Sequence, residues 1–254
     1  MKSLYESLLD DEDDVVGKLD VKLLIEEWLK KYSIKNYKIN KDNTIDVKGD
    51  VRLYRYPEFE LPSYIQFGKV KGSFSIIYSK LKTLKGCPKE VGGSFSCNGC
   101  TDLKTLEGCP KEVGKSFDCY GCDSLTSLEG TPEKVGWDFY CNYCDSLQTL
   151  EGAPKIVGGN FYCNGCDSLK SLKGAPEKIM ITFNCTACPS LTSLKGAPKE
   201  VGVNFNCSDC ESLQTLEGAP EEVIGNFDCN NCKKLNITKE DIKKICEVRG
   251  EIHI

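Results

Sequence analysis

The chain of 254 residues is short of several residue types that chemistry usually needs: it has one histidine, two methionines and two tryptophans. The single histidine, His253, rules out Ser/His/Asp and Cys/His catalytic sites and any histidine-rich metal centre. Positive charge is not in excess, because 33 Lys and Arg residues stand against 38 Asp and Glu residues. A surface for nucleic acid needs concentrated positive charge. We therefore expect no enzyme and no nucleic-acid partner.

Long hydrophobic runs are also missing, so no membrane partner is expected. The opening sequence MKSLYESLLDDEDDVV has no basic start, no long apolar stretch and no small-residue cleavage site, so it does not resemble a secretory leader. A cytoplasmic location follows as the expectation. In a reducing cytoplasm the 17 cysteines would be thiols or metal ligands rather than disulfides.

What the chain does contain is a repeat. Fourteen cysteines form seven C-x-x-C pairs, and each pair follows the previous one by 22 residues. Seven uninterrupted copies of L-x-[ST]-L-x-G-x-P-x-x-V-G-x-x-F-x-C-x-x-C-x-x cover residues 81–234. A repeat of this length predicts a solenoid, in which one copy makes one turn and buries its apolar side chains against neighbouring turns.

The pattern within a copy predicts its local structure. Phe117 and Cys119 alternate with an outward residue, which indicates a short strand with both side chains facing inward. The Gly and Pro before the valine exclude a helix on the return side, so that segment should be extended or turn-like. Its interior residues would be Leu103, Leu106 and Val113.

These residues resemble the leucine-rich-repeat family, in a short form that has no helix on the convex side. The family's strand pattern L-x-x-L-x-L-x-x-[NC]-x-L corresponds to Phe-x-Cys-x-x-Cys-x-x-Leu, which puts the second cysteine at the family's Asn/Cys ladder position. More narrowly, the wording L-[ST]-L-[EK]-G-x-P is similar to repeats in uncharacterised proteins of tailed phages, crAss-like and related, and of some bacteria. The resemblance implies an α/β repeat solenoid: a right-handed superhelix with short parallel strands on its concave face and a non-helical convex side.

Four regions are expected: an acidic segment over residues 1–20, an N-terminal cap with a degenerate first repeat over 21–80, the seven repeats over 81–234, and a C-terminal cap over 235–254. In the N-terminal cap, Asp20 should start an amphipathic helix, followed by a hairpin across Lys41-Asp42-Asn43. In the degenerate repeat, Ile76 stands where the first cysteine would be. In the C-terminal cap, Thr238 should start a helix that reaches about Val248.

Function is expected at positions where the copies differ, since packing accounts for the constant ones. Aromatic residues with polar tips gather on the outward positions of the central copies, and lysine is scarce there. Such residues are enriched in protein interfaces, although tyrosine also suits exposed strand positions by its propensity alone. The sequence therefore predicts a non-enzymatic scaffold, without a cofactor, that binds a protein partner through its concave face. The predicted site consists of Asp118, Tyr120, Trp137, Asp138, Tyr140, Tyr143 and Tyr162.

Two other functions stay open. Neighbouring copies together match the Cys-x-x-Cys pattern of four-thiolate sites for zinc or iron, although the same positions are needed as inward, apolar sites of the solenoid. The third possibility is a structural or virion-associated component. If the protein is phage-encoded, it would be located in the host cytoplasm or on the virion. The sequence does not predict an oligomeric state. The cysteines of the metal alternative are Cys97, Cys100, Cys119, Cys122, Cys141, Cys144, Cys163, Cys166, Cys185, Cys188, Cys207, Cys210, Cys229 and Cys232.

Overall fold

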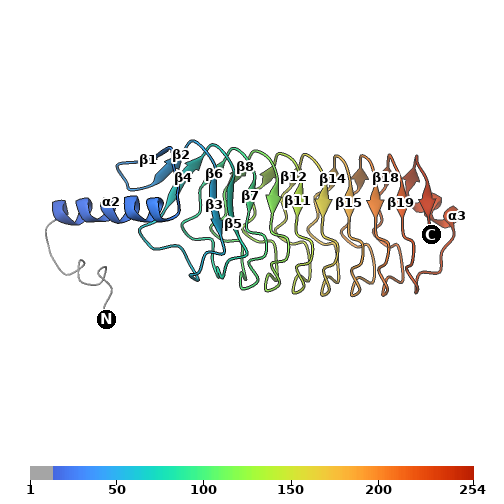
Figure 1. Cartoon of the computed structure of the whole chain (residues 1–254). Coiled ribbons are helices and arrows are strands. Elements are labelled where there is room, and N and C mark those ends of the chain that lie inside the picture. The colour runs from blue at the N-terminus through green and yellow to red at the C-terminus, as the bar shows by residue number, and fades with distance from the viewer. Residues whose placement is uncertain (1–13) are drawn as a thin grey trace.

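Each repeat copy forms one turn of a parallel β-solenoid in the computed structural model, which describes residues 14–254 (Figure 1). A copy contributes two short strands, one ending at its valine or isoleucine and one starting at its phenylalanine. In the third copy these are β10 (Lys134–Val135) and β11 (Phe139–Tyr140). The turns follow one another in a nearly straight row (Figure 1). The expected solenoid is confirmed, and within residues 14–254 helices occur in the two caps alone.

The strands that start at phenylalanine belong to a ten-stranded parallel sheet, one strand for each turn. In the repeats they are β7 (Phe95–Ser96), β9 (Phe117–Asp118), β11, β13 (Phe161–Tyr162), β15 (Phe183–Asn184), β17 (Phe205–Asn206) and β19 (Phe227–Asp228). The opposite strands are β6 (Glu90–Val91), β8 (Glu112–Val113), β10, β12 (Ile156–Val157), β14 (Lys178–Ile179), β16 (Glu200–Val201) and β18 (Glu222–Val223). The return side expected to be extended thus also forms sheet.

Two turns precede the seven copies. The predicted hairpin is present as β1 (Tyr37–Ile39) and β2 (Ile45–Val47), which pair antiparallel. Strands β2 and β3 (Val51–Tyr54) form the first of these turns. The second turn consists of β4 (Phe67–Val70) and β5 (Phe74–Ile77). Ile76 is buried and its strand β5 pairs in register with β7, so the degenerate repeat is confirmed. The pairing of β3 with β5 adds a second degenerate turn ahead of it.

The core consists of columns of identical residues, as the register predicted. Phenylalanine rings from Phe74 to Phe227 are stacked from turn to turn, with neighbouring centroids between 5.0 and 5.8 Å apart. All fourteen cysteines of the C-x-x-C pairs are buried, as are the two leucines of each copy, such as Leu103 and Leu106. Both cysteines of a pair therefore face inward, and their conspicuous spacing is explained by packing.

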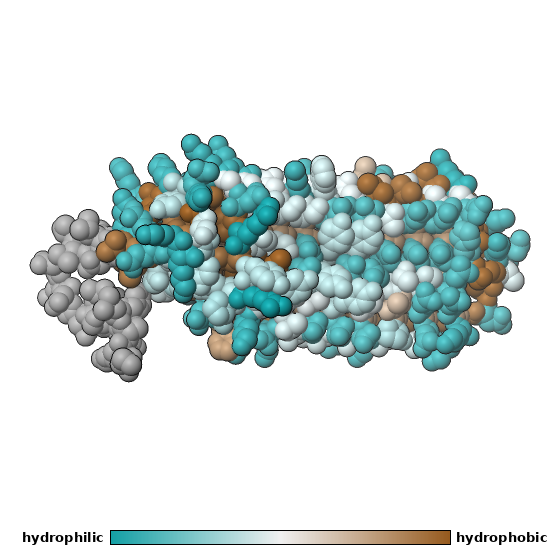
Figure 2. Space-filling model, in the orientation of Figure 1, coloured by the Kyte–Doolittle hydropathy of each residue, from teal (hydrophilic) through white to brown (hydrophobic). Residues whose placement is uncertain are grey.

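The sheet formed by the opposite strands is interrupted in the fifth copy. It divides into a seven-stranded part that ends at β12 and a four-stranded part that begins at β14. At this point Met180 and Ile181 replace residues that are glycine in several other copies, and both side chains are exposed. Val203 and Ile224, which stand at the equivalent positions of the next two copies, are exposed as well. Figure 2 shows an apolar patch along the upper edge of the later turns.

The N-terminal cap helix begins earlier than expected. It is α2 (Asp14–Lys31), so the start after Asp20 was wrong by seven residues. Ile25, Trp28 and Leu29 are buried against the first turns, as the amphipathic pattern predicted. Residues 1–13 of the acidic segment lie outside the described part of the chain.

The C-terminal cap helix is shorter than expected. It is α3 (Lys239–Ile245), which Thr238 caps through a reciprocal capping box with Asp241. The predicted end near Val248 was wrong, because Cys246 adopts an extended backbone and β20 (Glu247–Val248) joins the sheet beside β18. β21 (Ile252–His253) then pairs with β19. The cap is thus a further solenoid turn. Neither helix in residues 14–254 is long and apolar enough to span a bilayer.

Candidate functional site

Four tyrosines gather on the outer side of the ten-stranded sheet and are called the aromatic face below: Tyr120, Tyr140, Tyr143 and Tyr162. Tyr140 and Tyr162 are register partners on β11 and β13, and their rings are stacked with centroids 5.1 Å apart and planes 7° apart. Tyr120 and Tyr143 form a second pair with centroids 5.2 Å apart. The structure therefore brings the four predicted tyrosines together as two pairs.

Tyr140 and Tyr162 occupy a position that has a backbone role in the other copies. The side chain between the Phe and the first Cys accepts a hydrogen bond from the backbone N–H two residues later, at 2.9 to 3.3 Å. Five copies make this bond, through Ser96, Asp118, Asn184, Asn206 and Asp228. A tyrosine cannot make it, because its hydroxyl lies at the far end of the ring. The stacked pair therefore replaces a stabilising backbone contact.

Tyr143 also departs from the preference of its position. Its φ is 54°, and the equivalent residues in the other copies, Gly99, Gly121, Gly165, Ala187, Asp209 and Asn231, have positive φ as well. A tyrosine in this left-handed region costs about 1 kcal/mol relative to glycine. Its ring lies over Gly165, where an added Cβ would be 2.6 Å from a ring carbon. Residues that break local rules of a scaffold are expected at functional sites.

The two predicted aspartates serve the solenoid itself. Oδ1 of Asp138 accepts hydrogen bonds from the backbone and side-chain nitrogens of Asn160, both at 2.8 Å, and its Oδ2 accepts one from the Tyr140 hydroxyl at 3.1 Å. Burial, together with Asp138, raises the pKa of Tyr140 to about 12, so this hydroxyl stays a donor. Oδ2 of Asp118 accepts from the Ser96 hydroxyl at 3.1 Å. Both carboxylates are therefore already hydrogen-bonded to residues of the solenoid, which they hold in place.

Trp137, the remaining predicted residue, lies at the corner between β10 and β11. It is 59% exposed, and the Lys115 ammonium is 5.5 Å from its ring centroid. This contact is a cation–π pair within the chain. Among the described residues, the ring contact of Trp137 is with Lys115 and not with the four tyrosines.

Three aspartates that the sequence prediction left out lie next to the aromatic face. They follow the second cysteine in the second, third and fourth copies and are called the acidic row: Asp123, Asp145 and Asp167. Partial burial and the negative charges of Asp167 and Asp123 raise the pKa of Asp145. Within residues 14–254, no ion pair joins the row to a Lys or Arg. The signal in the sequence was the repeated Cys-Asp-Ser, which packing alone does not require.

No protein-family model, curated protein or solved structure matches the chain.

The cysteines form a hydrogen-bonded ladder. The thiol of each second cysteine donates to the backbone carbonyl of the first cysteine one turn earlier, as from Cys144 to Cys119 and from Cys166 to Cys141, both at 3.2 Å. Burial raises the pKa of Cys141 and Cys163 well above the ordinary value. Thiolates are the form that binds metal. Among the described residues, no group of three or more His, Cys, Asp or Glu side chains is placed to hold a metal ion.

We expect the thiols to be unreactive in the folded protein. At about pH 8 a disulfide reagent should modify few or none of the 17 cysteines, because the thiolate is the reactive form and burial suppresses it. After unfolding, all of them should react. Thiol counting combined with elemental analysis measures this. Stoichiometric zinc or iron, with thiols that stay masked until the metal is removed, would contradict the ladder and favour the metal alternative.

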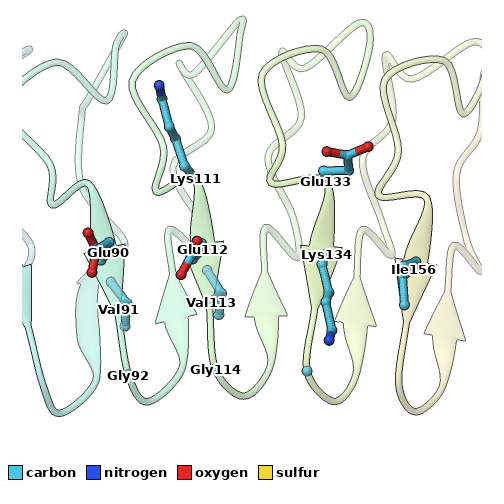
Figure 3. Close-up of a pocket in the computed structure, with 11 residues that line it drawn as sticks. Glu90, Val91, Gly92, Lys111, Glu112, Val113, Gly114, Glu133, Lys134 and Ile156 are labelled. Carbon is cyan, nitrogen blue, oxygen red and sulfur yellow. The ribbon is translucent and has the colours of Figure 1, made fainter.

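A shallow cavity of about 750 Å³ lies on the other sheet, across β6, β8, β10 and β12 (Figure 3). Its floor includes Gly114 and Gly136, where an added Cβ at Gly136 would be 2.1 Å from the Gly114 carbonyl oxygen. The close approach of the turns thus explains these glycines. The charged side chains around the cavity diverge, with Lys111 and Lys134 pointing in opposite directions (Figure 3). This cavity has no converging groups that would bind one ligand.

Proposed function

We propose that this protein is a non-enzymatic scaffold that binds a protein partner through the aromatic face. The observation that carries the proposal is that Tyr140, Tyr162 and Tyr143 stand where the solenoid itself favours other residues. Two of them replace a backbone cap and the third adopts a left-handed conformation. Asparagine at the first two positions would restore the backbone cap, and glycine at the third would adopt the left-handed conformation without a steric cost.

The shape of the face supports contact with another protein. The stacked rings of Tyr140 and Tyr162 hold each other in place, and the Asp138 carboxylate fixes the Tyr140 hydroxyl. Rigid aromatic side chains lose little conformational entropy when a partner binds, and tyrosine is among the residues that contribute most to interface energy.

Replacing Tyr140 and Tyr162 together by asparagine tests the proposal. Asparagine occupies this position in the fifth and sixth copies and caps the backbone there. We expect the double variant to fold with unchanged or higher stability, by about 0.5–1 kcal/mol per restored bond. It should lose binding to peptides that were selected on the wild-type protein from a random displayed library. Titration of purified peptide against both proteins measures the loss.

The matched control is Asn206 replaced by tyrosine, which adds a ring to the same face two turns beyond Tyr162. This control should retain the selected peptides. Peptides that bind the wild type and the Tyr140/Tyr162 double variant equally would place binding elsewhere and defeat the proposal.

We further infer that the turns are leucine-rich repeats of the right-handed, short kind and that the chain acts in a cytoplasm or on a virion, as a phage-encoded protein. The buried leucine pairs, such as Leu147 and Leu150, and the polar ladder position taken by the second cysteine support the first inference. The absence of disulfides among the cysteines is consistent with a reducing compartment.

A further inference from the structure

We infer that the partner segment bound at the aromatic face is an extended, positively charged peptide whose Lys or Arg side chains bind the acidic row. This inference rests on the proposed function and names the chemistry of the partner. The carboxylates concerned are those of Asp123, Asp145 and Asp167, and the rings beside them are those of Tyr120 and Tyr143.

The acidic row is continuous with the aromatic face along the chain. Asp123 follows Tyr120 by three residues, and Asp145 follows Tyr143 by two. Backbone hydrogen bonds tie the row from turn to turn, since the Ser146 N–H donates to the Asp123 carbonyl and the Ser168 N–H donates to the Asp145 carbonyl, both at 3.1 Å. Neighbouring strands lie about 4.8 Å apart, so the three carboxylates form a line about 10 Å long.

Two other copies show how a Lys side chain binds at the position that follows the second cysteine. In the sixth and seventh copies the residues equivalent to the acidic row are Glu211 and Lys233. Their side chains form an ion pair with Nζ and Oε1 2.6 Å apart. A cation in this column therefore binds the carboxylate one turn earlier. The acidic row has three successive carboxylates and no such cation among the described residues, so an external Lys or Arg can supply the missing one.

Several charges elsewhere on the turns are paired within the chain. Examples are Lys155 with Glu133 at 2.8 Å and Lys173 with Glu151 at 2.7 Å, each one turn apart. The acidic row differs, because its three carboxylates lie in consecutive turns and repel one another. This repulsion is consistent with the raised pKa of Asp145. A bound cation relieves this repulsion, so the row is complementary to positive charge.

The dimensions favour an extended segment. In an extended peptide, side chains on one side recur about every 7 Å, so two basic residues separated by one other residue fit within the 10 Å line of the row. The aliphatic stems of Lys or Arg would then cross the rings of Tyr120 and Tyr143, which are 40% and 48% exposed. Such stems cover apolar surface while their charged ends reach the carboxylates, and a ring face attracts the cation.

The experiment uses the full chain and a random displayed peptide library. Peptides are selected on the wild type and counter-selected on the Tyr140→Asn/Tyr162→Asn variant. The strongest peptides are then synthesised with each arginine as such or as uncharged citrulline. We expect enrichment of basic residues separated by one residue, and about a tenfold loss of affinity both for the citrulline peptide and for the variant Asp123→Asn/Asp145→Asn/Asp167→Asn. The matched control removes the same charge elsewhere, as Glu107→Gln/Glu129→Gln/Glu221→Gln, and should bind as the wild type does.

The outcomes separate the two proposals. Peptides that depend on Tyr140 and Tyr162 but are neutral or acidic would overturn the positively charged partner and leave the proposed function standing. An equal loss of affinity in both triple variants would also overturn it, because the effect would then reflect net charge alone. A library that yields no peptide dependent on Tyr140 and Tyr162 would overturn the proposed function together with the inference.

Discussion

Raising the pH from about 7 to about 10 is expected to unfold the protein, because its buried thiols ionise only after unfolding. Burial raises the pKa of Cys100 to about 12 and holds the pKa values of Cys141, Cys163 and Cys207 well above the ordinary range. Folded-state pKa values above the unfolded ones make stability complete below about pH 8.5 and progressively lost above it.

The number of thiols makes this effect large. Each buried thiol removes about 1.4 kcal/mol of unfolding free energy per pH unit once the pH exceeds the unfolded pKa. Thirteen of the fourteen cysteines in the C-x-x-C pairs have a raised pKa, and together they give a slope on the order of 18 kcal/mol per pH unit. A whole domain is stable by roughly 5–15 kcal/mol, so the transition should be complete near pH 10.

Urea unfolding at a series of pH values, followed by circular dichroism under reducing conditions, measures the slope. The control replaces Cys163 and Cys185 by valine, since Ile76 already fills the equivalent position in the degenerate turn. This change should lower the slope by about 3 kcal/mol per pH unit. An unfolding free energy that stays constant up to about pH 10 would mean that the thiols ionise in the folded state.

Replacing Phe139 by alanine is expected to lower the unfolding free energy by about 3–5 kcal/mol. Phe139 is fully buried, and its ring centroid lies 5.4 Å from that of Phe117 and 5.0 Å from that of Phe161. The change leaves a cavity that adjoins three turns at once. Because each turn packs only against its neighbours, the loss weakens the middle of the stack, where no other contact can replace it.

Denaturant unfolding and amide hydrogen exchange measure this loss and its location. Exchange should accelerate in the second to fourth copies and remain slow in α2 and α3. Phe139→Leu, which retains most of the volume, should cost markedly less, and Trp137→Ala should stay within about 0.5 kcal/mol because that side chain is exposed. A uniform increase of exchange along the whole chain would contradict the nearest-neighbour picture of the stack.

Much of the fold was predictable from residues that recur every 22 positions. Equal spacing brings equivalent residues into register, so Phe139 was predicted to pack against Phe117 and Phe161. The alternation at Phe-x-Cys predicted that Tyr140 points outward. The helix boundaries were less predictable. Whether Glu247 and Val248 continue α3 or form β20 depends on the edge that β18 offers, and that edge is more than twenty residues away.

The sequence by itself determined the repeat, the inward columns and the four tyrosines of the aromatic face, because periodicity alone decides which side chains are stacked and on which side. Only the tertiary structure decided the roles of the carboxylates. Asp118 and Asp138 accept hydrogen bonds from groups of their own and adjacent turns, whereas the row of Asp123, Asp145 and Asp167 forms no ion pair with a Lys or Arg of residues 14–254. The physical reason is that a hydrogen bond or ion pair between turns depends on distances of a few ångströms between residues about 22 positions apart.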